Sequence, residues 1–471
     1  MIDLRELRDN PDRFREGAQA KRVEVDIDRL VALDADKRRL QGRQEEARAE
    51  QKRLGRETGP QMGKLKGELA QASEADRPNL ESQIAELEKR PAALKQEIQG
   101  LDAQISAIEP ELRTLLLAVP QPAAPEVPVG AGAEDNVEIR RWHPADGLDP
   151  GRPFAEQRGF APKTHLELVA ELGLADFERG VKMGGSRHYV LRGAGMRLHQ
   201  AILRYAFDFM TMEKGFTPMS VPVIVREECM VGTGFFPSGR DQSYHIEESA
   251  RGAGHDLFLT GTGEVGLMGL HSDEILDGND LPLRYTTVST CFRREAGAAG
   301  KDTAGFYRIH QFDKVEQVVI CRADADEQKA WHERMIGYVE ELMQSLGLPY
   351  RLLQCCTGDL GTKNEDMIDI ESWMPGRGPD GADGRPTGDW GETHSASRLS
   401  DFQCRRLNLR YRDENARKPV FAYSLNNTVA ASPRILIPLL EVHQQADGSV
   451  SIPEPLQPYM GGVARIEKTN P

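Results

Sequence analysis

Residues 80–115 carry apolar residues at alternating steps of three and four, and this repeat constrains the fold more than any other feature of the sequence. Such spacing places the apolar side chains on one stripe of a long helix, as in a coiled coil. A weaker stripe of the same period runs through residues 30–54, and residues 74–78 have the composition of a chain reversal. We therefore predict an antiparallel pair of long helices, with a kink at Pro91. The predicted stripe consists of Leu80, Ile84, Leu87, Leu94, Ile98, Leu101, Ile105, Ile108, Leu112 and Leu115 on one helix and of Leu30, Leu33, Leu40, Ala47 and Leu54 on the other.

Basic residues are concentrated on the first of these two predicted helices. Residues 37–66 contain ten Lys or Arg and four Glu, in a chain whose formal net charge is −14. A solvated coiled-coil surface or a dimerisation zipper would explain such a helix. A helical arm that contacts nucleic-acid phosphates would explain it as well, because Lys and Arg side chains pair with phosphate oxygens. The charge pattern by itself leaves both interpretations open.

The remaining composition restricts the class of protein. A chain of 471 residues with 39% hydrophobic and 28% charged residues is long enough for two domains with a buried core. A membrane-spanning helix needs about 18–20 consecutive apolar residues, and the sequence has no such run. Its opening, MIDLRELRDNPDRF, lacks the apolar core of a secretory signal. Six cysteines without a CxxC pair are typical of reduced thiols, so we expect a cytoplasmic protein.

The chain after the helical pair begins with a proline-rich linker at residues 120–132, and we expect one folded body after about residue 135. Pro222 restricts the strand predicted around it to a sheet edge or an interface. We expect the segment 376–391, rich in Gly, Pro and Asp, to be a surface loop without a functional site. The other predicted elements are helices over 198–214 and 324–346 and strands over 216–226 and 367–374.

Residues 285–321 predict an antiparallel hairpin whose tip, at 296–302, contains mainly small residues. Arg293 offers a planar, permanently charged fork that suits a phosphate. Glu295 can accept a hydrogen bond from an exocyclic amine, and Phe312 on the returning strand can stack on a purine. These residues indicate a nucleotide site without a P-loop, because the chain contains no GxxxxGK[ST]. The alternative is a solvated strand face with cross-strand ion pairs.

Three further segments combine polar residues that suit a small substrate and its counter-ion. Thr262 and Glu264 follow a predicted strand and could hold the polar groups of an amino acid, although an ordinary turn has the same composition. Glu392 and Ser395 could share a hard cation such as Mg²⁺, or they could form a helix capping box. Arg434 begins an apolar helix, where it faces an anion or is only a surface residue.

These segments occur in an order that resembles one enzyme family. The run CFRREAGAAGKDTAGFYRIHQFDKVE, and above all its ending HQFDKVE, resembles motif 2 of the class II aminoacyl-tRNA synthetases in the form carried by the seryl-tRNA synthetases. Residues 216–226 resemble motif 1, which forms the dimer interface in that family, and Arg434 matches the motif 3 arginine. The opening residues, the helical pair and the following EDNVEIRRW resemble the family's tRNA-binding arm and its junction. Gly263, His394 and Asn427 depart from the residues that are usual at their positions.

The resemblance extends over nearly the whole chain and implies an α+β fold. It predicts a long antiparallel coiled-coil hairpin, followed by a class II synthetase catalytic domain built on a mainly antiparallel sheet flanked by helices. The implied divisions are a tRNA-binding arm domain at 1–119, a linker at 120–134 and a catalytic domain at 135–471. The implied activity, of the bacterial type, is the ATP-dependent attachment of L-serine to tRNA(Ser), and to tRNA(Sec), through a seryl-adenylate.

The resemblance also implies which residues form the site. It assigns catalysis to Arg293 and Arg434. It assigns ATP binding to Arg293, Arg294, Glu295, Arg308, Phe312, Glu392, Thr393, His394, Ser395 and Arg434. It assigns serine binding to Thr262, Gly263, Glu264, Arg293, Glu316, Asn426 and Thr428. The basic helix supplies tRNA contacts from Arg39, Arg43, Lys52 and Arg53.

Cofactors and partners follow from the same resemblance. ATP is expected with Mg²⁺ on Glu392 and Ser395, and no zinc is expected, because Thr428 stands where a zinc-dependent variant would need a cysteine. The expected partners are tRNA(Ser), L-serine and a second copy of the chain, without membrane or DNA. Two rival functions remain: an aminoacyl ligase that loads a carrier protein, which the long arm disfavours, and a non-catalytic RNA-binding paralogue. The retention of Arg293, Glu295 and Arg434 disfavours the paralogue.

Overall fold

The computed structural model describes residues 1–252, 254–297, 304–382, 384–414 and 416–468. The chain divides into two compact units. The smaller unit contains residues 4–15 and 24–119, and the larger unit contains residues 1–3, 16–23 and 120–471. The chain therefore passes from the smaller to the larger unit at the predicted start of the linker, while two short N-terminal segments belong to the larger unit.

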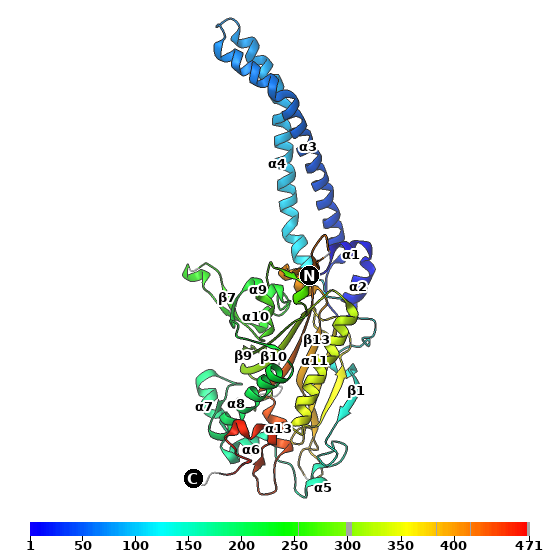
Figure 1. The fold of residues 1–471 in the computed structure, drawn as a ribbon, viewed down its shortest axis with the longest axis vertical. Coiled ribbons are helices and arrows are strands. Elements are labelled where there is room, and N and C mark those ends of the chain that lie inside the picture. The colour runs from blue at the N-terminus through cyan, green and yellow to red at the C-terminus, as the bar shows by residue number, and fades with distance from the viewer. Residues whose placement is uncertain (253, 298–303, 383, 415, 469–471) are drawn as a thin grey trace. The chain divides into compact units, whose positions relative to one another are not determined.

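The smaller unit is a long helical hairpin, as the heptad pattern predicts. Helix α3 (Ile27–Gln71) and helix α4 (Arg77–Ala118) run side by side in Figure 1, and the reversal between them occupies residues 72–76. Asp26 caps α3, because its side chain accepts a hydrogen bond of 2.8 Å from the Arg29 amide. Helix α4 continues through Pro91, and the hairpin bends in its distal part (Figure 1). Two short helices, α1 (Leu4–Asp9) and α2 (Pro11–Ala20), precede the hairpin in the chain.

The predicted apolar stripe forms the seam between α3 and α4. Every predicted seam residue is buried or half-buried, and Leu40, Leu101 and Ile105 pack together as one cluster. Gln44 on α3 donates a hydrogen bond to Asp102 on α4 beside this cluster. Exposed cross-helix ion pairs such as Arg29–Glu111, at 2.7 Å, flank the seam. Exposed pairs of this kind stabilise little, so apolar burial along the seam holds the hairpin together.

The larger unit is built on an eight-stranded sheet with the order β1-β11-β12-β13-β16-β10-β9-β4. All its neighbouring strands are antiparallel except β4 and β9, which run parallel at one edge. This confirms the predicted α+β class with a mainly antiparallel sheet. The strands are β1 (Val137–Trp142), β4 (Thr217–Met219), β9 (Leu283–Phe292), β10 (Gln311–Cys321), β11 (Tyr350–Gln354), β12 (Asp366–Met374), β13 (Asp389–Arg398) and β16 (Tyr423–Ser432).

Helices cover one face of this sheet and form the main core with it. Helix α11 (Ala325–Ser345) places Trp331, Met335 and Val339 in that core, and Asp324 caps it, as the predicted helix over 324–346 requires. The Met335 carbonyl accepts hydrogen bonds from side chains of β10 and β16, so α11 is bonded to the sheet as well as packed on it. The other covering helices are α6 (His165–Leu172), α8 (Gly193–Asp208) and α13 (Leu436–Val442).

The strand predicted over 216–226 is divided in the structure. β4 lies at the edge of the large sheet, while β5 (Ile224–Arg226) belongs to a separate three-stranded sheet. Pro222 lies between the two strands, where its missing amide hydrogen disrupts no ladder. The prediction of an edge position is confirmed, and the prediction of one continuous strand is wrong.

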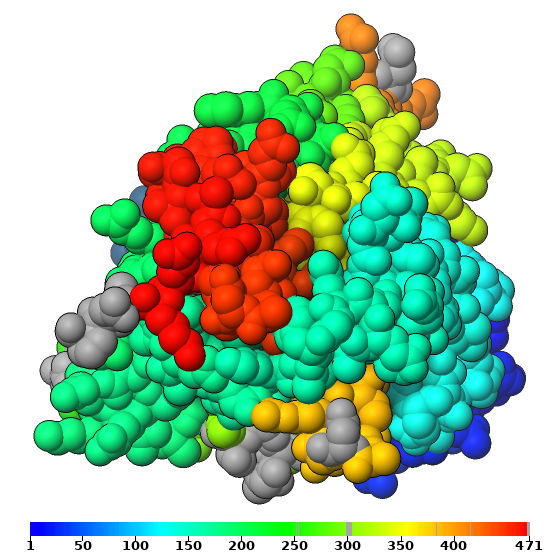
Figure 2. Space-filling view, turned by 90° about the horizontal axis from the view of Figure 1, so that it is seen from below, coloured from blue at the N-terminus to red at the C-terminus, as the bar shows by residue number. Residues whose placement is uncertain are grey.

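The remaining elements surround the large sheet. On the face shown in Figure 2, the C-terminal segment lies against the segment around residue 170, and Lys468 pairs there with Glu171 at 2.7 Å. Within the described ranges, no helix is long and apolar enough to cross a membrane. The remaining helices and strands are α5 (Phe154–Arg158), β2 (Ala175–Asp176), α7 (Phe177–Gly184), β3 (Val190–Leu191), α9 (Glu227–Gly232), β6 (Tyr244–Ile246), β7 (Leu257–Leu259), α10 (Glu264–Gly269), β8 (Ile275–Asp277), α12 (Phe402–Leu407), β14 (Arg410–Arg412), β15 (Val420–Phe421), β17 (Val450–Ser451) and β18 (Arg465–Ile466).

Candidate active site

The β9–β10 hairpin positions the first group of predicted site residues. Its ladder pairs Phe292 with Gln311, and hydrogen bonds continue beyond it, because the Arg293 amide donates to the His310 carbonyl at 2.9 Å. His310 Nδ1 donates in return to the Arg293 carbonyl at 2.9 Å. The backbone of Arg293 is therefore held on both sides, and its guanidinium carbon lies 5.2 Å from the centre of the Phe312 ring. Residues 298–303, which form most of the predicted tip with Lys301 and Asp302, lie outside the described residues.

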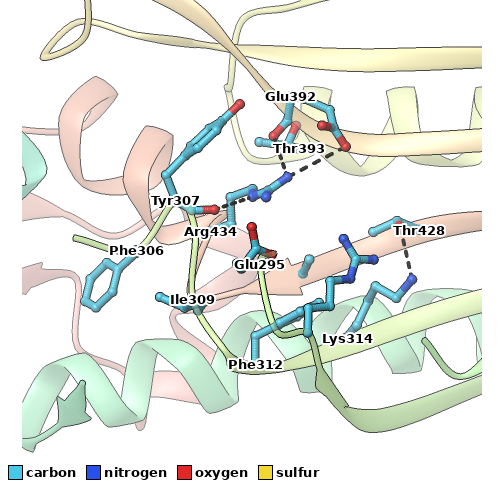
Figure 3. Close-up of a pocket in the computed structure, with 12 residues that line it drawn as sticks. Glu295, Phe306, Tyr307, Ile309, Phe312, Lys314, Glu392, Thr393, Thr428 and Arg434 are labelled. Atoms are coloured by element: carbon cyan, nitrogen blue, oxygen red, sulfur yellow. Dashed lines mark hydrogen bonds and ion pairs between the residues drawn. The ribbon is translucent and has the colours of Figure 1, made fainter. Parts of the chain in front are cut away.

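A pocket opens beside this hairpin and collects residues from distant parts of the chain (Figure 3). β9–β10 and its loop supply one wall, and β13, β16 and the start of α13 supply the other. Seven of the predicted ATP-binding and serine-binding residues meet there. They are Arg293, Glu295, Phe312, Glu392, Thr393, Thr428 and Arg434, and the lining is completed by Phe306, Tyr307, Ile309, Lys314 and Ala431.

Glu295 and Arg308 connect this pocket with a neighbouring one. Glu295 lines both pockets, and Arg308 lines the second, where Arg308 Nη1 lies 3.5 Å from Glu295 Oε2. Glu295 has a positive φ of 52°, which is uncommon for a residue other than glycine. Residues held in such conformations cluster at functional sites, because the surrounding structure must enforce them.

Arg434 is held by hydrogen bonds to both walls of the pocket. Its Nε donates to the Tyr307 carbonyl at 3.0 Å, and Nη1 donates to the Glu392 carbonyl at 3.2 Å. Nη1 also lies 3.6 Å from Glu392 Oε1. Figure 3 shows the guanidinium between Tyr307 and Glu392. A planar, preorganised arginine at this position is suited to bind phosphate.

A β-bulge brings Glu392 and Ser395 to the same face of the sheet. Residues three apart on a regular strand point to opposite faces, but the β12–β13 ladder pairs Glu371 with Glu392 and Ile370 with His394, so that Thr393 is the extra residue. Ser395 is paired directly with Asp369. The bulge thereby aligns the Glu392 carboxylate with the Ser395 hydroxyl, which the sequence spacing alone would separate.

The carboxylates around this bulge form an environment that suits a hard cation. Burial, followed by the charge of Glu392, raises the pKa of Asp369 well above its ordinary value. Among the described side chains, Asp369 Oδ1 is a buried oxygen without a hydrogen-bond partner. Glu371 lies beside them but is neutralised by Arg351 at 2.6 Å. Carboxylate and hydroxyl oxygens are ligands that Mg²⁺ accepts, so the residues present fit that ion.

His394, Arg294 and Ser395 are not among the described residues that line the first pocket. The His394 ring is 1% exposed and shares a hydrogen bond of 2.9 Å with the Thr393 hydroxyl. Burial lowers the pKa of His394 to about 3, so this ring is neutral at physiological pH. Arg294 is exposed at the hairpin. The nucleotide-binding roles that the resemblance assigns to His394 and Arg294 stay predictions.

Five of the residues predicted to bind the amino acid belong to one buried network: Thr262, Glu264, Glu316, Asn426 and Thr428. Lys314 is its centre: Nζ donates to the Thr262 hydroxyl at 2.9 Å and to the Thr428 hydroxyl at 3.5 Å, and it also pairs with Glu316. Burial raises the pKa of Glu316, and the charge of Lys314 opposes that shift. Lys314 is absent from the predicted set, although it shares a strand face with Phe312 and Glu316 in HQFDKVE, and that alternation could have identified it.

Glu264 is held in this network by three donors. Its carboxylate accepts hydrogen bonds from Lys363 at 2.6 and 2.8 Å, from Gln403 at 2.6 Å and from Asn426 at 2.7 Å. Asn426 is a predicted site residue, whereas Lys363 and Gln403 are not. Both come from segments without a recognisable motif, so no signal in the sequence could have located them.

Two of the departures from the family pattern have a structural reason. A Cβ at Gly263 would lie 2.4 Å from Thr287 Cγ2, so the Thr287 methyl group already fills the space that a larger residue would need. Asn427 donates to the Met335 carbonyl at 3.1 Å on the α11 face of the sheet, away from Asn426. The substitution at 427 therefore lies outside the amino-acid network.

The four basic residues predicted to contact tRNA are exposed on α3. Arg39 lies 2.9 Å from Asp36, Arg43 lies 3.4 Å from Glu97, and Arg53 lies 3.5 Å from Glu57. These solvent-exposed pairs are weak, so a polyanion can replace the carboxylates at small cost. Arg43, Lys52 and Arg53 are also outside the apolar seam.

Comparison with known proteins identifies relatives over the whole length of the chain. Residues 1–122 match the family described as the seryl-tRNA synthetase N-terminal domain, and residues 244–443 match the class II tRNA synthetase core domain (G, H, P, S and T). The chain is 41% identical to a serine–tRNA ligase of Deinococcus radiodurans, covering 98% of each chain, and 40% identical to one of Streptomyces coelicolor, covering 99% of each. A crystal structure of seryl-tRNA synthetase from Pyrococcus horikoshii complexed with ATP superposes with a TM-score of 0.79 at 36% identity, covering 100% of both chains.

Proposed function

The chain belongs to the seryl-tRNA synthetase family, and from that premise we propose that it is a serine–tRNA ligase acting on tRNA(Ser). In the first step, a serine carboxylate oxygen attacks the α-phosphorus of ATP, and pyrophosphate leaves with the electron pair of the broken P–O bond. In the second step, a hydroxyl of the 3′-terminal adenosine attacks the carbonyl carbon of seryl-adenylate, and AMP leaves. Neither step needs strong acid–base chemistry, so catalysis rests on positioning and on charge neutralisation.

The observation that supports this proposal most strongly is the meeting of the nucleotide-binding and amino-acid-binding residues at one pocket. Arg293, Phe312 and Arg434 line it, and Lys314 and Thr428 connect the same wall to the buried network around Glu264. A carboxylate bound in that network and an α-phosphate bound by Arg293 would be adjacent. That adjacency is what adenylate formation requires.

The nucleotide roles follow from this arrangement. Arg293 would bind the α-phosphate, and because its guanidinium rests on the Phe312 ring, nucleotide binding would replace this cation–π contact with an ionic one. Phe312 would stack on the adenine ring, and Glu295 would accept a hydrogen bond from its amino group. Arg434 and Arg308 would bind the β and γ phosphates.

Mg²⁺ would be held by Glu392 and Ser395, which the bulge at Thr393 aligns. When bound, the ion would offset negative charge on the phosphate oxygens. Glu392 would then have two partners, because Arg434 already lies 3.6 Å from its carboxylate. Arg434 and the cation site would therefore be positioned as one group.

Serine would be recognised by hydroxyl, carboxylate and ammonium groups that are almost fully buried. Thr262, Glu264, Glu316 and Thr428 would surround its polar groups, with Lys314 fixing three of them. The Glu316 carboxylate is buried and pairs with Lys314, and a carboxylate oxygen has further capacity to accept a hydrogen bond from the serine hydroxyl or ammonium group. An alanine would leave such a group unpaired, so the site would reject it strongly.

The hairpin of the smaller unit would bind tRNA through its exposed basic side chains. The same proposal includes an arm domain at 1–119 and a catalytic domain at 135–471. It also includes tRNA(Sec) as a second substrate. A carrier-protein ligase would have no use for the arm, so tRNA charging separates that alternative from ours.

A homodimer is also part of the proposal. The resemblance of residues 216–226 to motif 1, which forms the dimer interface in the family, supports it. Ile224, in that segment of the chain, is an apolar side chain that remains 48% exposed in the single chain.

Amino-acid-dependent exchange of pyrophosphate into ATP tests the proposed function. Each of the twenty amino acids is supplied with the purified chain, ATP, Mg²⁺ and labelled pyrophosphate. We expect strong exchange with serine alone. Comparable exchange with glycine, alanine or threonine would contradict the assignment.

A further inference from the structure

The Tyr307 ring is approached by two arginines, and only one of them belongs to a recognised motif. Arg434 Cζ lies 4.6 Å from the ring centre, and Arg377 Cζ lies 4.2 Å from it. Tyr307 itself lines the nucleotide pocket (Figure 3). We propose that Arg377 is a further nucleotide-binding residue, which binds the β and γ phosphates of ATP and the pyrophosphate product together with Arg434. This inference rests on the proposed function.

Tyr307 is a fixed platform for both arginines. The residue is 9% exposed, and its carbonyl accepts the hydrogen bond from Arg434 Nε. Gly391 leaves room for the ring, because a Cβ at that position would lie only 3.0 Å from Tyr307 Cε2. Two guanidinium groups on one ring lie within about twice the stacking distance of each other, which is close enough for both to contact a diphosphate.

The backbone of Arg377 is also anchored on both sides. Its amide donates to the Met374 carbonyl at 3.0 Å, and its carbonyl accepts from the Gly388 amide at 3.0 Å. The preceding Gly376 amide donates to Glu441 Oε2 at 2.8 Å. Glu441 lies on α13, which begins two residues after Arg434. One helix therefore fixes the positions of both arginines.

The neighbouring charges favour an anion that contacts both arginines beside the Tyr307 ring. Glu371 and Glu392 are the carboxylates that act on the Tyr307 hydroxyl together with Arg377 and Arg434. Glu371 is already bound by Arg351, and Glu392 is the proposed ligand of Mg²⁺. With these carboxylates engaged, a polyphosphate is the chemical group that best complements two stacked arginines. Arg377 lies in the segment 376–391, for which the sequence predicted no functional site; part of that segment is visible at the lower edge of Figure 2 (gold).

A purely structural role for Arg377 is the alternative, in which it only supports the Tyr307 ring. The two roles differ in which ligands they affect. A phosphate-binding residue affects ATP and pyrophosphate but not a seryl-adenylate analogue, which lacks the β and γ phosphates. A support for Tyr307 affects all three ligands, because the ring lines the shared pocket.

The test compares Arg377→Ala with Arg385→Ala, a matched control from the same segment whose side chain pairs with Glu167 at 2.8 Å. KM for ATP and for pyrophosphate is measured by serine-dependent exchange, and calorimetry gives Kd for a non-hydrolysable seryl-adenylate analogue. Loss of one charged hydrogen-bond donor is expected to raise both KM values about tenfold or more in Arg377→Ala. The analogue's Kd should change less than about twofold, and Arg385→Ala should resemble the unmodified protein in every measurement.

Two results would overturn the inference. One is KM values within twofold of the unmodified protein, and the other is an equal loss of affinity for ATP and the analogue. If Arg377→Ala does not fold, Arg377→Lys is tested in its place, and its effect on KM for ATP and pyrophosphate is again compared with its effect on Kd for the analogue. An unmodified chain without serine-dependent exchange would instead refute the proposed function, whereas normal exchange with an unaffected Arg377→Ala would refute only the role of Arg377.

Discussion

Gly263→Ala should weaken serine binding, because the structure leaves no room for the added methyl group. A Cβ at this position would lie 2.4 Å from Thr287 Cγ2 and 3.0 Å from Ser289 Oγ. Carbon atoms in contact prefer about 3.5–4.0 Å, so the two groups would have to separate by roughly 1 Å. Overpacking of this kind costs about 1–3 kcal/mol. If displacement of the loop carries that cost, KM for serine rises about 5- to 140-fold, at 1.4 kcal/mol for each factor of ten.

The serine site should be affected more than the nucleotide site. Gly263 lies between Thr262 and Glu264, which both belong to the amino-acid network, so a displaced loop moves their side chains away from Lys314 and Asn426. KM for serine and KM for ATP are measured separately by pyrophosphate exchange, and thermal unfolding reports any loss of stability. Gly261→Ala is the matched control on the same loop, because its Cβ would meet ordinary contacts of 3.4 Å.

Thr287→Ser provides the second half of a double-mutant cycle. It removes the methyl group that occupies the space beside Gly263 while keeping the hydroxyl. Gly263→Ala combined with Thr287→Ser should therefore recover most of the serine affinity lost by Gly263→Ala alone, which is the signature of two groups in direct contact. An unchanged KM for serine in Gly263→Ala, or an equal loss in the double variant, would refute the steric argument.

Three further predictions concern separate parts of the molecule. Arg293→Ala should lower serine-dependent exchange by about 10²–10³-fold, the loss that follows removal of other preorganised contacts to a reacting group. The variant should remain folded. Near-normal exchange would show that Arg293 is only a strand residue. Burial lowers the pKa of Lys21 to about 7 from an ordinary 10.5. Between pH 7 and pH 10.5 the unfolded chain therefore binds more protons than the folded chain, so the free energy of unfolding rises with pH. Lys21→Met should flatten the rise in Tm between pH 7 and pH 9, and an identical slope in both proteins would contradict that assignment. Alanine at the exposed basic positions Arg43, Lys52 and Arg53 should weaken tRNA binding while sparing serine-dependent exchange. The slope of log affinity against log salt concentration should fall by roughly 0.7–0.9 for each phosphate that is no longer bound. Unchanged tRNA charging would instead favour a spacer role for the hairpin.

The parts of the fold that the sequence predicted are those set by local periodicity. The seam of the hairpin follows from apolar residues at heptad spacing, and the β9–β10 hairpin follows from two apolar runs around a tip of small residues. The limits of these elements are less predictable. The reversal of the arm occupies 72–76 rather than 74–78, because Arg77 and Pro78 already begin α4.

The site could be predicted only where a motif carries its residues. Arg293, Phe312 and Arg434 meet at the pocket, because each stands in a recognisable segment. The bulge at Thr393 could not be read from the sequence, since it depends on how β13 pairs with β12, and without it Glu392 and Ser395 would occupy opposite faces. Lys363 reaches Glu264 across 99 residues of chain, and only the tertiary fold brings them together.

Charging of tRNA(Ser) with labelled amino acids tests the central claim most directly. The full chain is incubated with a tRNA(Ser) transcript, ATP, Mg²⁺ and each amino acid in turn, and label bound to the 3′ end of the tRNA is measured. A phosphopantetheine-bearing carrier protein is supplied in a parallel reaction. We predict that serine alone is attached to the tRNA and that the carrier protein receives nothing. Serine-dependent exchange without tRNA charging, or transfer of serine to the carrier protein, would contradict the account.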